Sequence, residues 1–458
     1  MSPSDLAPRE SEIAVIGLAR SGRAAAILLK KQGYNVYASD IASSPETGRC
    51  AEDLRAAGIA VDVGRHDLER IARAGLVVVS PGVPPTARPV TYAREHDVRV
   101  ASEVEIALHF LTESRVIAVT GTNGKTTTTA LIAHLLRGLD LEATEAGNIG
   151  TPLSEIVARE THPQWIALEM SSFQLHDTPS LNPVVGVLTN LSPDHLDRYA
   201  SVEDYFADKA MLFANADADS VWVVNADDVA VQKLVRHVAG EKFDFSLRKK
   251  AGAYLDERAD TLHALGAPLV KRRDLPLLGA HNVANCLAAA LAVMVADRAH
   301  QTVKARKGIA AALRTFQSLP HRLELVGEFG GVQWINDSKA TNVSSTTVAV
   351  DGMERPTVLL LGGRHKGEAY TPLADGIKNR VKKVIAYGEA AAIIARDLRP
   401  VVEVVRLGTD FDEVMRVAKA SARPGDAVLL SPACSSYDMF TNYEERGERF
   451  RSLATAEG

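Results

Sequence analysis

The chain contains 458 residues, of which 46% are hydrophobic and 24% are charged, and its formal net charge is -5 at pH 7. This length predicts two to four domains, and three is the natural division. The negative net charge argues against nucleic acid as the main partner, because surfaces that bind nucleic acid are usually basic. Small anionic substrates are not excluded, since single lysines and helix ends can bind them.

The spacing of the cysteines and the length of the apolar stretches indicate the cellular compartment to expect for this protein. Cys50, Cys286 and Cys434 are far apart and lack the spacing of a metal site, so we expect no disulfide framework and a cytoplasmic protein. The first ten residues have no apolar core of the kind found in signal peptides. The longest apolar helix that we expect, residues 286–296, is too short to cross a bilayer, so we expect no membrane insertion.

The first segment follows the order of a dinucleotide-binding unit. An apolar run at residues 12–17 predicts a strand, and a glycine turn and a helical stretch follow it through Lys31. A second strand, residues 34–39, ends at Asp40. The order of strand, glycine turn, helix, strand and acid is typical of Rossmann-like folds.

The glycine turn of this segment departs from the usual fingerprint. Ala19 stands where a second glycine would let a pyrophosphate approach closely, which disfavours a nicotinamide site. A nucleotide held by Arg20, Ser21 and the helix end agrees with the pattern. Residues 76–82 again end a strand in a glycine turn. We therefore predict a Rossmann-like domain that binds a ligand.

A phosphate-binding loop is predicted in the middle of the chain. An apolar run leads through Gly-Thr-Asn-Gly-Lys-Thr, residues 121–126, into a helical run. Backbone N–H groups at a helix start carry partial positive charge and bind phosphate. Lys125 would add a cation for the outer phosphates and Thr126 a hydroxyl for Mg²⁺. A capping turn with a surface lysine is the alternative. Val119 stands where the usual P-loop has its first glycine, so the loop is more compact than usual.

Two later strand ends carry side chains that suit a metal. The buried run at residues 165–168 delivers Glu169, and the strand expected at residues 184–191 leads to His195 between two aspartates. Alone, His195 could be a loop histidine, but beside a metal site it becomes a candidate for a second cation. Alternating strands and helices predict a parallel sheet with helices on both faces, and ligands bind beyond the carboxyl ends of such strands.

Lys209 is centred on an apolar helical face. Its neighbours at helical spacing are Tyr205, Phe206, Leu212 and Phe213. Desolvation there would lower its pKa, and a neutral amine can react with carbon dioxide to give a carbamate that binds Mg²⁺. From spacing alone, a lysine that extends to water or pairs with an acid is the favoured interpretation.

The last segment predicts a second doubly wound sheet. Strand patterns lie at residues 331–336, 357–361, 383–387 and 427–431, with helical stretches between them. Three polar turns follow such strands, at residues 336–341, 361–367 and 431–437. Three polar turns at the strand ends of one sheet favour a ligand-binding site there.

Before this segment, Asn282 and Asn285 share a face near a predicted helix start, where asparagines are more often caps than ligands.

These motifs, in this order along nearly the whole chain, resemble the Mur ligases, the ATP-dependent amide ligases that build the peptide of bacterial peptidoglycan. The phosphate loop alone is shared with folylpolyglutamate ligases. Residues 336–341 and 431–434 narrow the resemblance to the branch that adds D-glutamate to UDP-N-acetylmuramoyl-L-alanine. The matching blocks are residues 17–22, 80–82, 121–126, 147–150, 169–174, 194–199, 281–285, 320–322, 336–342 and 431–434.

The resemblance implies an α/β protein of three domains. A Rossmann-like N-terminal domain, residues 1–104, would bind the UDP-substrate. A central P-loop-type ATPase domain with a mostly parallel sheet, residues 105–317, would bind ATP, and a C-terminal Rossmann-like domain, residues 318–458, would bind D-glutamate. Two Mg²⁺ ions, a carbamylated Lys209 and a monomer are also expected.

The resemblance further implies the site residues, and it overturns the interpretation of Lys209 from spacing. Lys125, His195 and Lys209 would be catalytic. Expected ATP contacts are Gly121, Thr122, Asn123, Gly124, Lys125, Thr126, Thr127, Asn285, Arg322 and Asp337. Expected Mg²⁺ ligands are Thr126, Glu169, His195 and Lys209. Expected UDP-substrate contacts are Arg20, Ser21, Asp40, Gly82, Asn148, Ser171 and Gln174. Expected D-glutamate contacts are Lys339, Thr341, Lys366, Ser436 and Tyr443.

The chain departs from the family at two places, and several alternatives stay open. Ala42 stands where some members have an arginine near uracil, and Arg364-His365 precede Lys366 where others have an acid and a glycine. A nicotinamide dehydrogenase would explain the first segment but none of residues 119–209. A non-catalytic nucleotide sensor would lack the metal ligands, which are present. Another Mur ligase or a folylpolyglutamate ligase is the main competitor.

Overall fold

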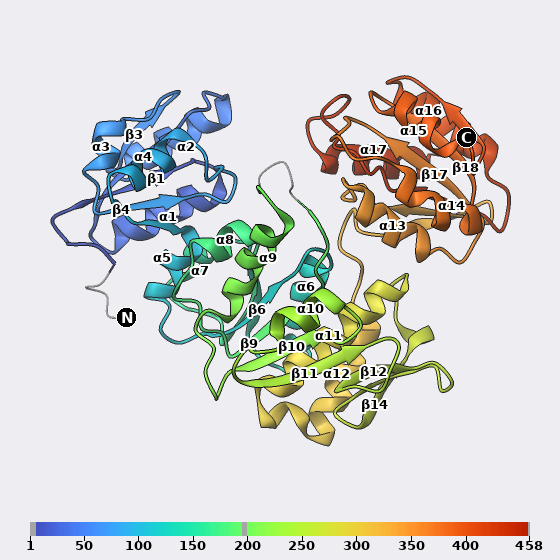
Figure 1. The fold of residues 1–458 in the computed structure, drawn as a ribbon, viewed down its shortest axis with the longest axis horizontal. Coiled ribbons are helices and arrows are strands. Elements are labelled where there is room, and N and C mark those ends of the chain that lie inside the picture. Colours follow the sequence, from blue (N-terminus) through green and yellow to red (C-terminus); the bar gives the residue numbers. More distant parts are fainter. Residues whose placement is uncertain (1–5, 195–198, 457–458) are drawn as a thin grey trace. The chain divides into compact units, whose positions relative to one another are not determined.

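The computed structural model describes residues 6–194 and 199–456, which form two compact units. The first unit comprises Met1–Asp274 and Ala284–Arg314, and the second comprises Leu275–Val283 and Thr315–Gly458. Three mostly parallel sheets with helices between their strands confirm the α/β class (Figure 1). The domain boundaries at residues 104 and 317 stay predictions.

The N-terminal sheet of the first unit has five parallel strands in the order β3-β2-β1-β4-β5. The chain order reverses between β1 and β4, and ligands of open α/β sheets bind at such a switch point. Its elements are β1 (Glu12–Ile16), α1 (Arg20–Lys31), β2 (Asn35–Asp40), α2 (Pro45–Ala56), β3 (Ala60–Val63), α3 (Leu68–Ala72), β4 (Leu76–Val79), α4 (Arg88–Glu95), β5 (Val100–Ser102) and α5 (Glu103–Phe110).

Small side chains let α1 lie close to this sheet. Ala24, Ala25 and Ala26 are buried on the helix. At Gly22 a Cβ atom would lie 1.8 Å from the carbonyl oxygen of Gly17, so only glycine permits this approach. The predicted glycine turn therefore has a packing role.

The second sheet of this unit has nine strands in the order β14-β13-β12-β11-β10-β9-β6-β8-β7. The strands from β7 to β12 pair in parallel, and β13 and β14 extend the sheet by antiparallel pairing. Its elements are β6 (Arg115–Thr120), α6 (Lys125–Arg137), β7 (Ala143–Gly147), α7 (Leu153–Val157), β8 (Trp165–Glu169), α8 (Ser172–His176), β9 (Val185–Leu188), α9 (Val202–Ala210), η2 (Met211–Phe213), β10 (Val221–Asn225), α10 (Val229–Val235), β11 (Glu241–Ser246), β12 (Ala253–Asp256), β13 (Thr261–Ala264), β14 (Ala267–Lys271), η3 (Arg272–Asp274), α11 (Ala280–Ala296), η4 (Arg298–Gln301) and α12 (Val303–Thr315).

The two sheets of the first unit share a hydrophobic core, in which α1 and α5 pack on α7. Polar bonds also join them. The Arg20 guanidinium donates to the carbonyl of Gly150 at 2.6 Å, and Lys31 Nζ donates to the carbonyl of Ala158 at 3.1 Å. In the part of the chain that the structure describes, no helix combines the length and apolarity needed to span a bilayer.

The sheet of the second unit has the strand order β15-β16-β20-β17-β18-β19, and only β15 runs antiparallel to its neighbour. The four strands predicted from the sequence for this segment correspond to β16, β17, β18 and β20, so that prediction is confirmed. Apolar clusters cover both faces of the sheet. The elements are β15 (Glu324–Phe329), β16 (Val332–Asn336), α13 (Val343–Asp351), β17 (Thr357–Gly362), η5 (Thr371–Leu373), α14 (Ala374–Arg380), β18 (Val381–Tyr387), α15 (Ala391–Leu398), β19 (Val404–Arg406), α16 (Phe411–Ser421), β20 (Ala427–Leu430) and α17 (Tyr443–Thr455).

Candidate active site

The predicted phosphate loop connects β6 to α6 at the carboxyl edge of the second sheet. Gly124 precedes α6 with φ of 80°, and a Cβ atom there would lie 2.4 Å from Asn285 Oδ1. The positive φ and the lack of space for a Cβ atom both restrict this position to glycine. Lys125 Nζ donates to the carbonyls of Gly121 at 3.0 Å and Thr122 at 2.7 Å. The ammonium thus lies over the loop, where an outer phosphate would meet it.

The end of β9 braces this loop. Asn190 Oδ1 accepts from the backbone N–H of Asn123 at 2.8 Å, and its Nδ2 donates to the carbonyl of Asn123 at 2.9 Å. Thr189 Oγ1 donates to the same carbonyl at 2.7 Å. Neither Thr189 nor Asn190 was predicted from the sequence to have a role. Their position just past a strand that neighbours β6 was the only signal.

Glu169 lies at the end of β8, beside the strand that carries the phosphate loop. Its side chain is 1% exposed, and Oε1 accepts from Asn148 Nδ2 at 2.8 Å. Oε2 is buried, and none of the described residues gives it a hydrogen-bond partner. A buried carboxylate oxygen without a partner is unfavourable in an empty site and suits a cation.

Lys209 lies on α9, and its side chain is 1% exposed, which excludes the interpretation that it extends to water. Its Nζ donates to Thr120 Oγ1 at 3.1 Å. Burial, reinforced by the charge of Lys125, lowers the pKa of Lys209 well below its ordinary value. An amine of lowered pKa therefore lies beside the start of the phosphate loop. His195 lies outside the described residues.

Asn285 meets the start of α6 from α11. It lies inside the helix, not at its start, and its Oδ1 accepts from Thr128 Oγ1 at 3.3 Å. The capping role usual for asparagine near a helix start does not apply. Among the described residues, no group of three or more His, Cys, Asp or Glu side chains forms a metal site. A metal here would need a mixed set of ligands.

The residues predicted for the UDP-substrate border the switch point of the N-terminal sheet. The Asp40 carboxylate accepts from the backbone N–H groups of Leu18 at 2.7 Å and Ala42 at 2.8 Å. It therefore holds the loop after β1. A Cβ atom on Gly82 would meet nothing within 4 Å, so space is open there. Arg20 and Ser21 open α1.

Ser171 and Gln174 form a capping box at the start of α8. Gln174 Oε1 accepts from the backbone N–H and the hydroxyl of Ser171, at 3.0 and 2.9 Å. Gln174 Nε2 is buried, and within residues 6–194 and 199–456 it has no hydrogen-bond partner. The two residues are thus engaged with each other, and one amide group is left for a ligand.

In the second unit, the three predicted polar turns lie at the ends of the adjacent strands β16, β20 and β17. The backbone N–H of Arg364 donates to the carbonyl of Ser435 at 2.9 Å, which joins two of the turns. Lys366 Nζ donates to Thr341 Oγ1 at 3.3 Å, and Lys339 Nζ lies 3.8 Å from the centre of the Tyr443 ring. Most residues predicted for D-glutamate therefore gather at one edge.

Asp337 directly follows β16 in the same cluster. Its Oδ2 accepts from the Ser431 hydroxyl at 2.8 Å and its Oδ1 from the backbone N–H of Leu323 at 3.2 Å. Burial raises the pKa of Asp337 from 3.8 to about 7. The predicted ATP contacts are thus divided, with the loop and Asn285 in the first unit and Arg322 and Asp337 in the second.

Arg446 on α17 holds this cluster together, although no role was predicted for it from the sequence. The side chain is fully buried. Its guanidinium donates to the Ser338 hydroxyl at 2.9 Å, the Ser338 carbonyl at 2.9 Å and the Cys434 carbonyl at 3.2 Å. No local signal marks it, because α17 is rich in charged residues on its exposed faces.

Comparison with known proteins identifies relatives for every part of this arrangement. Family models match residues 11–102 (Mur ligase MurD-like, N-terminal domain), 119–293 (Mur ligase middle domain) and 321–434 (Mur ligase, glutamate ligase domain). The chain is 38% identical over 451 residues to a UDP-N-acetylmuramoylalanine–D-glutamate ligase of Acidobacterium capsulatum, covering 97% of this chain and 96% of the relative. It is also 38% identical over 451 residues to the protein of the same name from Cytophaga hutchinsonii, covering 96% and 98%.

Two solved structures share the fold. A UDP-N-acetylmuramate-alanine ligase from Thermotoga maritima aligns with a TM-score of 0.62 at 20% identity, over 98% of this chain and 100% of the other. A MurF ligase from Thermotoga maritima in complex with ADP aligns with a TM-score of 0.62 at 15% identity, over 92% and 94%. At these identities the likeness concerns the fold.

Proposed function

This chain belongs to the Mur ligase family, and from that premise we propose that it joins D-glutamate to UDP-N-acetylmuramoyl-L-alanine in an ATP-dependent reaction that yields ADP and phosphate. The observation that carries the proposal is 38% identity, over 97% of the chain, to a relative named for that reaction. The product is an intermediate of peptidoglycan synthesis. Both substrates are small molecules, and we propose a cytoplasmic monomer with domains at residues 1–104, 105–317 and 318–458.

ATP would bind with its phosphates on the loop before α6. The N–H groups at the start of that helix and the Lys125 ammonium supply positive charge to the phosphates. Lys125 would exchange its bonds to the loop carbonyls for a bond to the γ-phosphate. Support comes from the position of Lys125 within 3.0 Å of both carbonyls, above the loop. The proposed ATP contacts are residues 121–127, Asn285, Arg322 and Asp337.

Magnesium fits the side chains beside the loop. Glu169 Oε2 is buried without a partner in the part of the chain that the structure describes, and Thr126 follows Lys125 at the helix start. Thr126 and Glu169 would hold one ion, and His195 with a carbamylated Lys209 would hold a second. When bound, the ions would neutralise negative charge on the γ-phosphate.

Carbamylation of Lys209 agrees with its surroundings. Desolvation and the charge of Lys125 disfavour a second ammonium, so the Lys209 amine is available to attack carbon dioxide. The amine nitrogen forms a bond to carbon and releases a proton, which leaves a carbamate anion. An anion here would be attracted to Lys125, where the ammonium is repelled.

The reaction proceeds through an acyl phosphate. The L-alanine carboxylate attacks the γ-phosphorus, and ADP leaves. The amine of D-glutamate then attacks the acyl carbon, phosphate leaves and an amide remains. Lys125 would orient the transferred phosphoryl group. Arg20, Ser21, Asp40, Gly82, Asn148, Ser171 and Gln174 would hold the UDP-substrate.

D-glutamate would bind at the edge of the sheet in the second unit. Lys339 and Lys366 provide two cations for its two carboxylates, and Thr341, Ser436 and Tyr443 provide hydroxyls. Support comes from the short contacts of Lys366 with Thr341 and of Lys339 with the Tyr443 ring. We further propose that closure of the third domain on the second brings ATP and glutamate together and excludes water.

One assay tests the proposed reaction. The purified protein is incubated with Mg-ATP, UDP-N-acetylmuramoyl-L-alanine and one amino acid at a time, and phosphate release and product mass are recorded. We expect phosphate release that depends on D-glutamate and a product enlarged by one glutamyl residue. L-Glutamate, L-lysine and diaminopimelate serve as controls. Turnover that is equal with another amino acid would refute the proposed specificity.

A further inference from the structure

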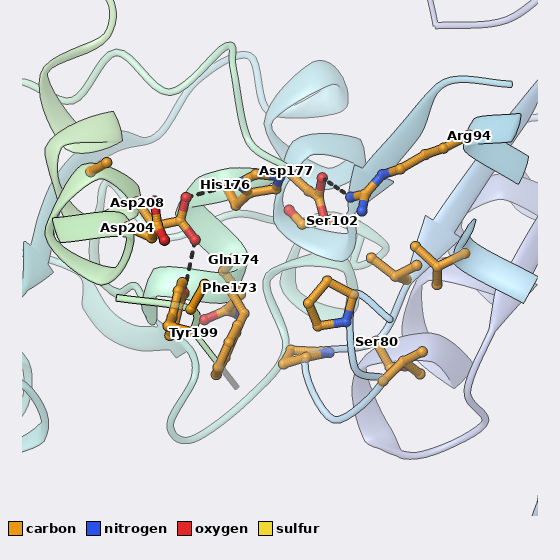
Figure 2. Close-up of a pocket in the computed structure, with 17 residues that line it drawn as sticks. Ser80, Arg94, Ser102, Phe173, Gln174, His176, Asp177, Tyr199, Asp204 and Asp208 are labelled. Carbon is orange, nitrogen blue, oxygen red and sulfur yellow. Dashed lines mark hydrogen bonds and ion pairs between the residues drawn. The ribbon is translucent and has the colours of Figure 1, made fainter. Parts of the chain in front are cut away.

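Four side chains of alternating charge lead from the N-terminal sheet to α9, the helix that carries Lys209. Arg94 on α4 pairs with Asp177 at 3.3 Å, and His176 at the end of α8 pairs with Asp208 on α9 at 2.7 Å. Asp177 directly follows His176 in the chain. Figure 2 shows the four side chains one after another, with both pairs drawn as dashed lines. The series ends one residue before Lys209.

Both oxygens of the Asp208 carboxylate are engaged. Oδ1 lies 2.7 Å from His176 Nδ1, and Oδ2 accepts from the Tyr199 hydroxyl at 2.8 Å. Lys209, the next residue in the chain, donates instead to Thr120 Oγ1 at 3.1 Å. The partners of Asp208 therefore hold its carboxylate while the amine of Lys209 faces the start of the phosphate loop.

The surroundings of His176 favour its charged form. The bond to Asp208 raises the pKa of His176 against the effect of burial, and the charges of Asp208 and Asp177 add to the rise. A histidine between two carboxylates is therefore held as an imidazolium. Its positive charge offsets the negative charge of Asp208.

The charges around Lys209 act in opposite directions. Burial and the charge of Lys125 lower the pKa of Lys209. Three carboxylates oppose this effect and favour the ammonium form, and they belong to Glu169, Asp194 and Asp208. Each carboxylate that loses its compensation therefore shifts the balance toward the ammonium.

These charges act across an interior that contains little water. Lys209 and Tyr205 are each 1% exposed, and the Lys209 Nζ atom lies 5.4 Å from the centre of the Tyr205 ring. The ring of Tyr199 packs against that of Tyr205, with centroids 5.3 Å apart. Electrostatic interactions are stronger in such surroundings than in water.

A carbamate at Lys209 would be an anion, so the three carboxylates that attract an ammonium would repel it. Metal ions and Lys125 would offset the charges of Glu169 and of the carbamate at the expected metal site. Asp208 is not among the ligands expected there. Its compensation has to come from elsewhere, and His176 supplies it.

We propose that His176 is a positioning residue for the carbamate: it holds and neutralises the Asp208 carboxylate, so that Lys209 reacts with carbon dioxide instead of remaining an ammonium. This role rests on the proposed carbamylation of Lys209. The covalent step is the one given above, in which the amine nitrogen bonds to carbon and its proton passes to water. The sequence singled out neither His176 nor Asp208.

The carbamate signal of the full-length protein measures this role. ¹³C NMR in the presence of Mg²⁺ and increasing ¹³C-bicarbonate gives the bicarbonate concentration at half-saturation. His176→Gln keeps a hydrogen-bond donor for Asp208 but removes the charge, and we expect half-saturation at about tenfold higher bicarbonate. His176→Lys keeps the charge and should half-saturate within about twofold of the wild type.

Asp208→Asn removes the charge that His176 offsets. Alone it should half-saturate at the same bicarbonate concentration as the wild type or a lower one, and in combination with His176→Gln it should restore wild-type saturation. If the pair served only to tie α8 to α9, Asp208→Asn would impair saturation as much as His176→Gln, because both break the same ion pair.

Turnover provides a second readout. At ambient carbon dioxide His176→Gln should lower kcat by up to about tenfold with little change in the KM values, and saturating bicarbonate should restore kcat. His237→Gln and Asp219→Asn, at exposed positions of the first unit, are the matched controls and should change nothing. Melting curves establish that each variant is folded.

Three results would overturn the proposal. The first is wild-type half-saturation in His176→Gln. The second is impairment of Asp208→Asn equal to that of His176→Gln, and the third is tenfold weaker saturation in His176→Lys. An active wild type without the signal would instead refute the carbamylation of Lys209, and this role with it. The wild type alone therefore tests the proposed function, and the variants test the role of His176.

Discussion

The Nζ atom of Lys209 lies 3.1 Å from Oγ1 of Thr120, at the point where β6 ends and the phosphate loop begins. The contact places a buried amine of lowered pKa beside the site where phosphate charge would gather. We predict a carbamate signal when the protein is placed in ¹³C-bicarbonate and examined by ¹³C NMR. Lys209→Arg should abolish the signal and reduce turnover roughly 100-fold or more. Lys249→Arg, an exposed control, should retain both. An active protein without the signal would contradict the assignment.

The substitution Glu169→Gln tests metal binding independently of folding stability. The change preserves volume and the bond that Oε1 accepts from Asn148, and it removes the charge of a buried oxygen that has no partner. We expect unfolding temperature without metal to stay the same or rise, because a buried charge is removed. Turnover should fall about 100-fold, with half-maximal activity shifted to higher Mg²⁺ concentration. Glu145→Gln on β7 is the control. Unchanged Mg²⁺ dependence in Glu169→Gln would exclude Glu169 as a ligand.

Gly124→Ala tests the geometry of the phosphate loop. The new methyl group would lie 2.4 Å from Asn285 Oδ1, at a φ of 80°. We expect destabilisation of about 1–3 kcal/mol and weaker Mg-ATP binding by calorimetry. Gly48→Ala on α2, where a Cβ atom meets nothing within 4 Å, should instead stabilise the protein by about 0.5–1 kcal/mol. Equal ATP affinity of both variants would argue against phosphate binding at this loop.

Arg446→Met removes the buried guanidinium that joins Ser338 to Cys434. Because several buried acceptors lose their donor, we expect destabilisation of about 3–5 kcal/mol. Surviving activity should show a raised KM for D-glutamate with a smaller change in the KM for ATP. Arg449→Met on the same helix breaks an exposed pair with Asp412 and should cost less than about 1 kcal/mol. Equal denaturant midpoints of unfolding for the two variants would contradict the role of Arg446 in joining Ser338 to Cys434.

Glu103 predicts how stability depends on pH. Burial raises its pKa from 4.5 to about 7, while Oε1 accepts from the backbone N–H of Ser154 at 2.5 Å. Between these values the folded state keeps a proton that the unfolded state releases, so stability falls as pH rises. The span corresponds to about 3 kcal/mol between pH 4.5 and pH 7. Glu103→Gln should flatten this part of the profile, measured by thermal unfolding from pH 4.5 to pH 8. An unchanged slope would show that Glu103 is ionised in the folded protein.

Strands buried along almost their whole length were predictable because burial on both faces leaves a continuous apolar run. The runs that became β6, β8, β17 and β20 are examples. The strands β12, β13 and β14 were not predicted. They have four or five residues, and only part of each is buried. Such strands form by pairing at a sheet edge, which leaves a weak trace in the sequence.

The candidate site likewise contains some residues that were predicted from the sequence and others that were not. Lys125, Thr126 and Glu169 were named from the sequence because a glycine turn or a buried strand directly precedes each of them. Asn190 and Arg446 were not, because their roles depend on partners that other strands and helices bring near.

By itself the sequence determined the main buried strands, the phosphate loop and the family, since these depend on local patterns and on blocks of neighbouring residues. Only the tertiary structure decided that Lys209 is buried against Thr120, 89 residues away in the chain. It likewise decided that Asn285 closes on Gly124, and that no described residue satisfies the buried amide group of Gln174. The physical reason is that burial and hydrogen-bond satisfaction are properties of packed surfaces, and packing joins residues that the sequence keeps far apart.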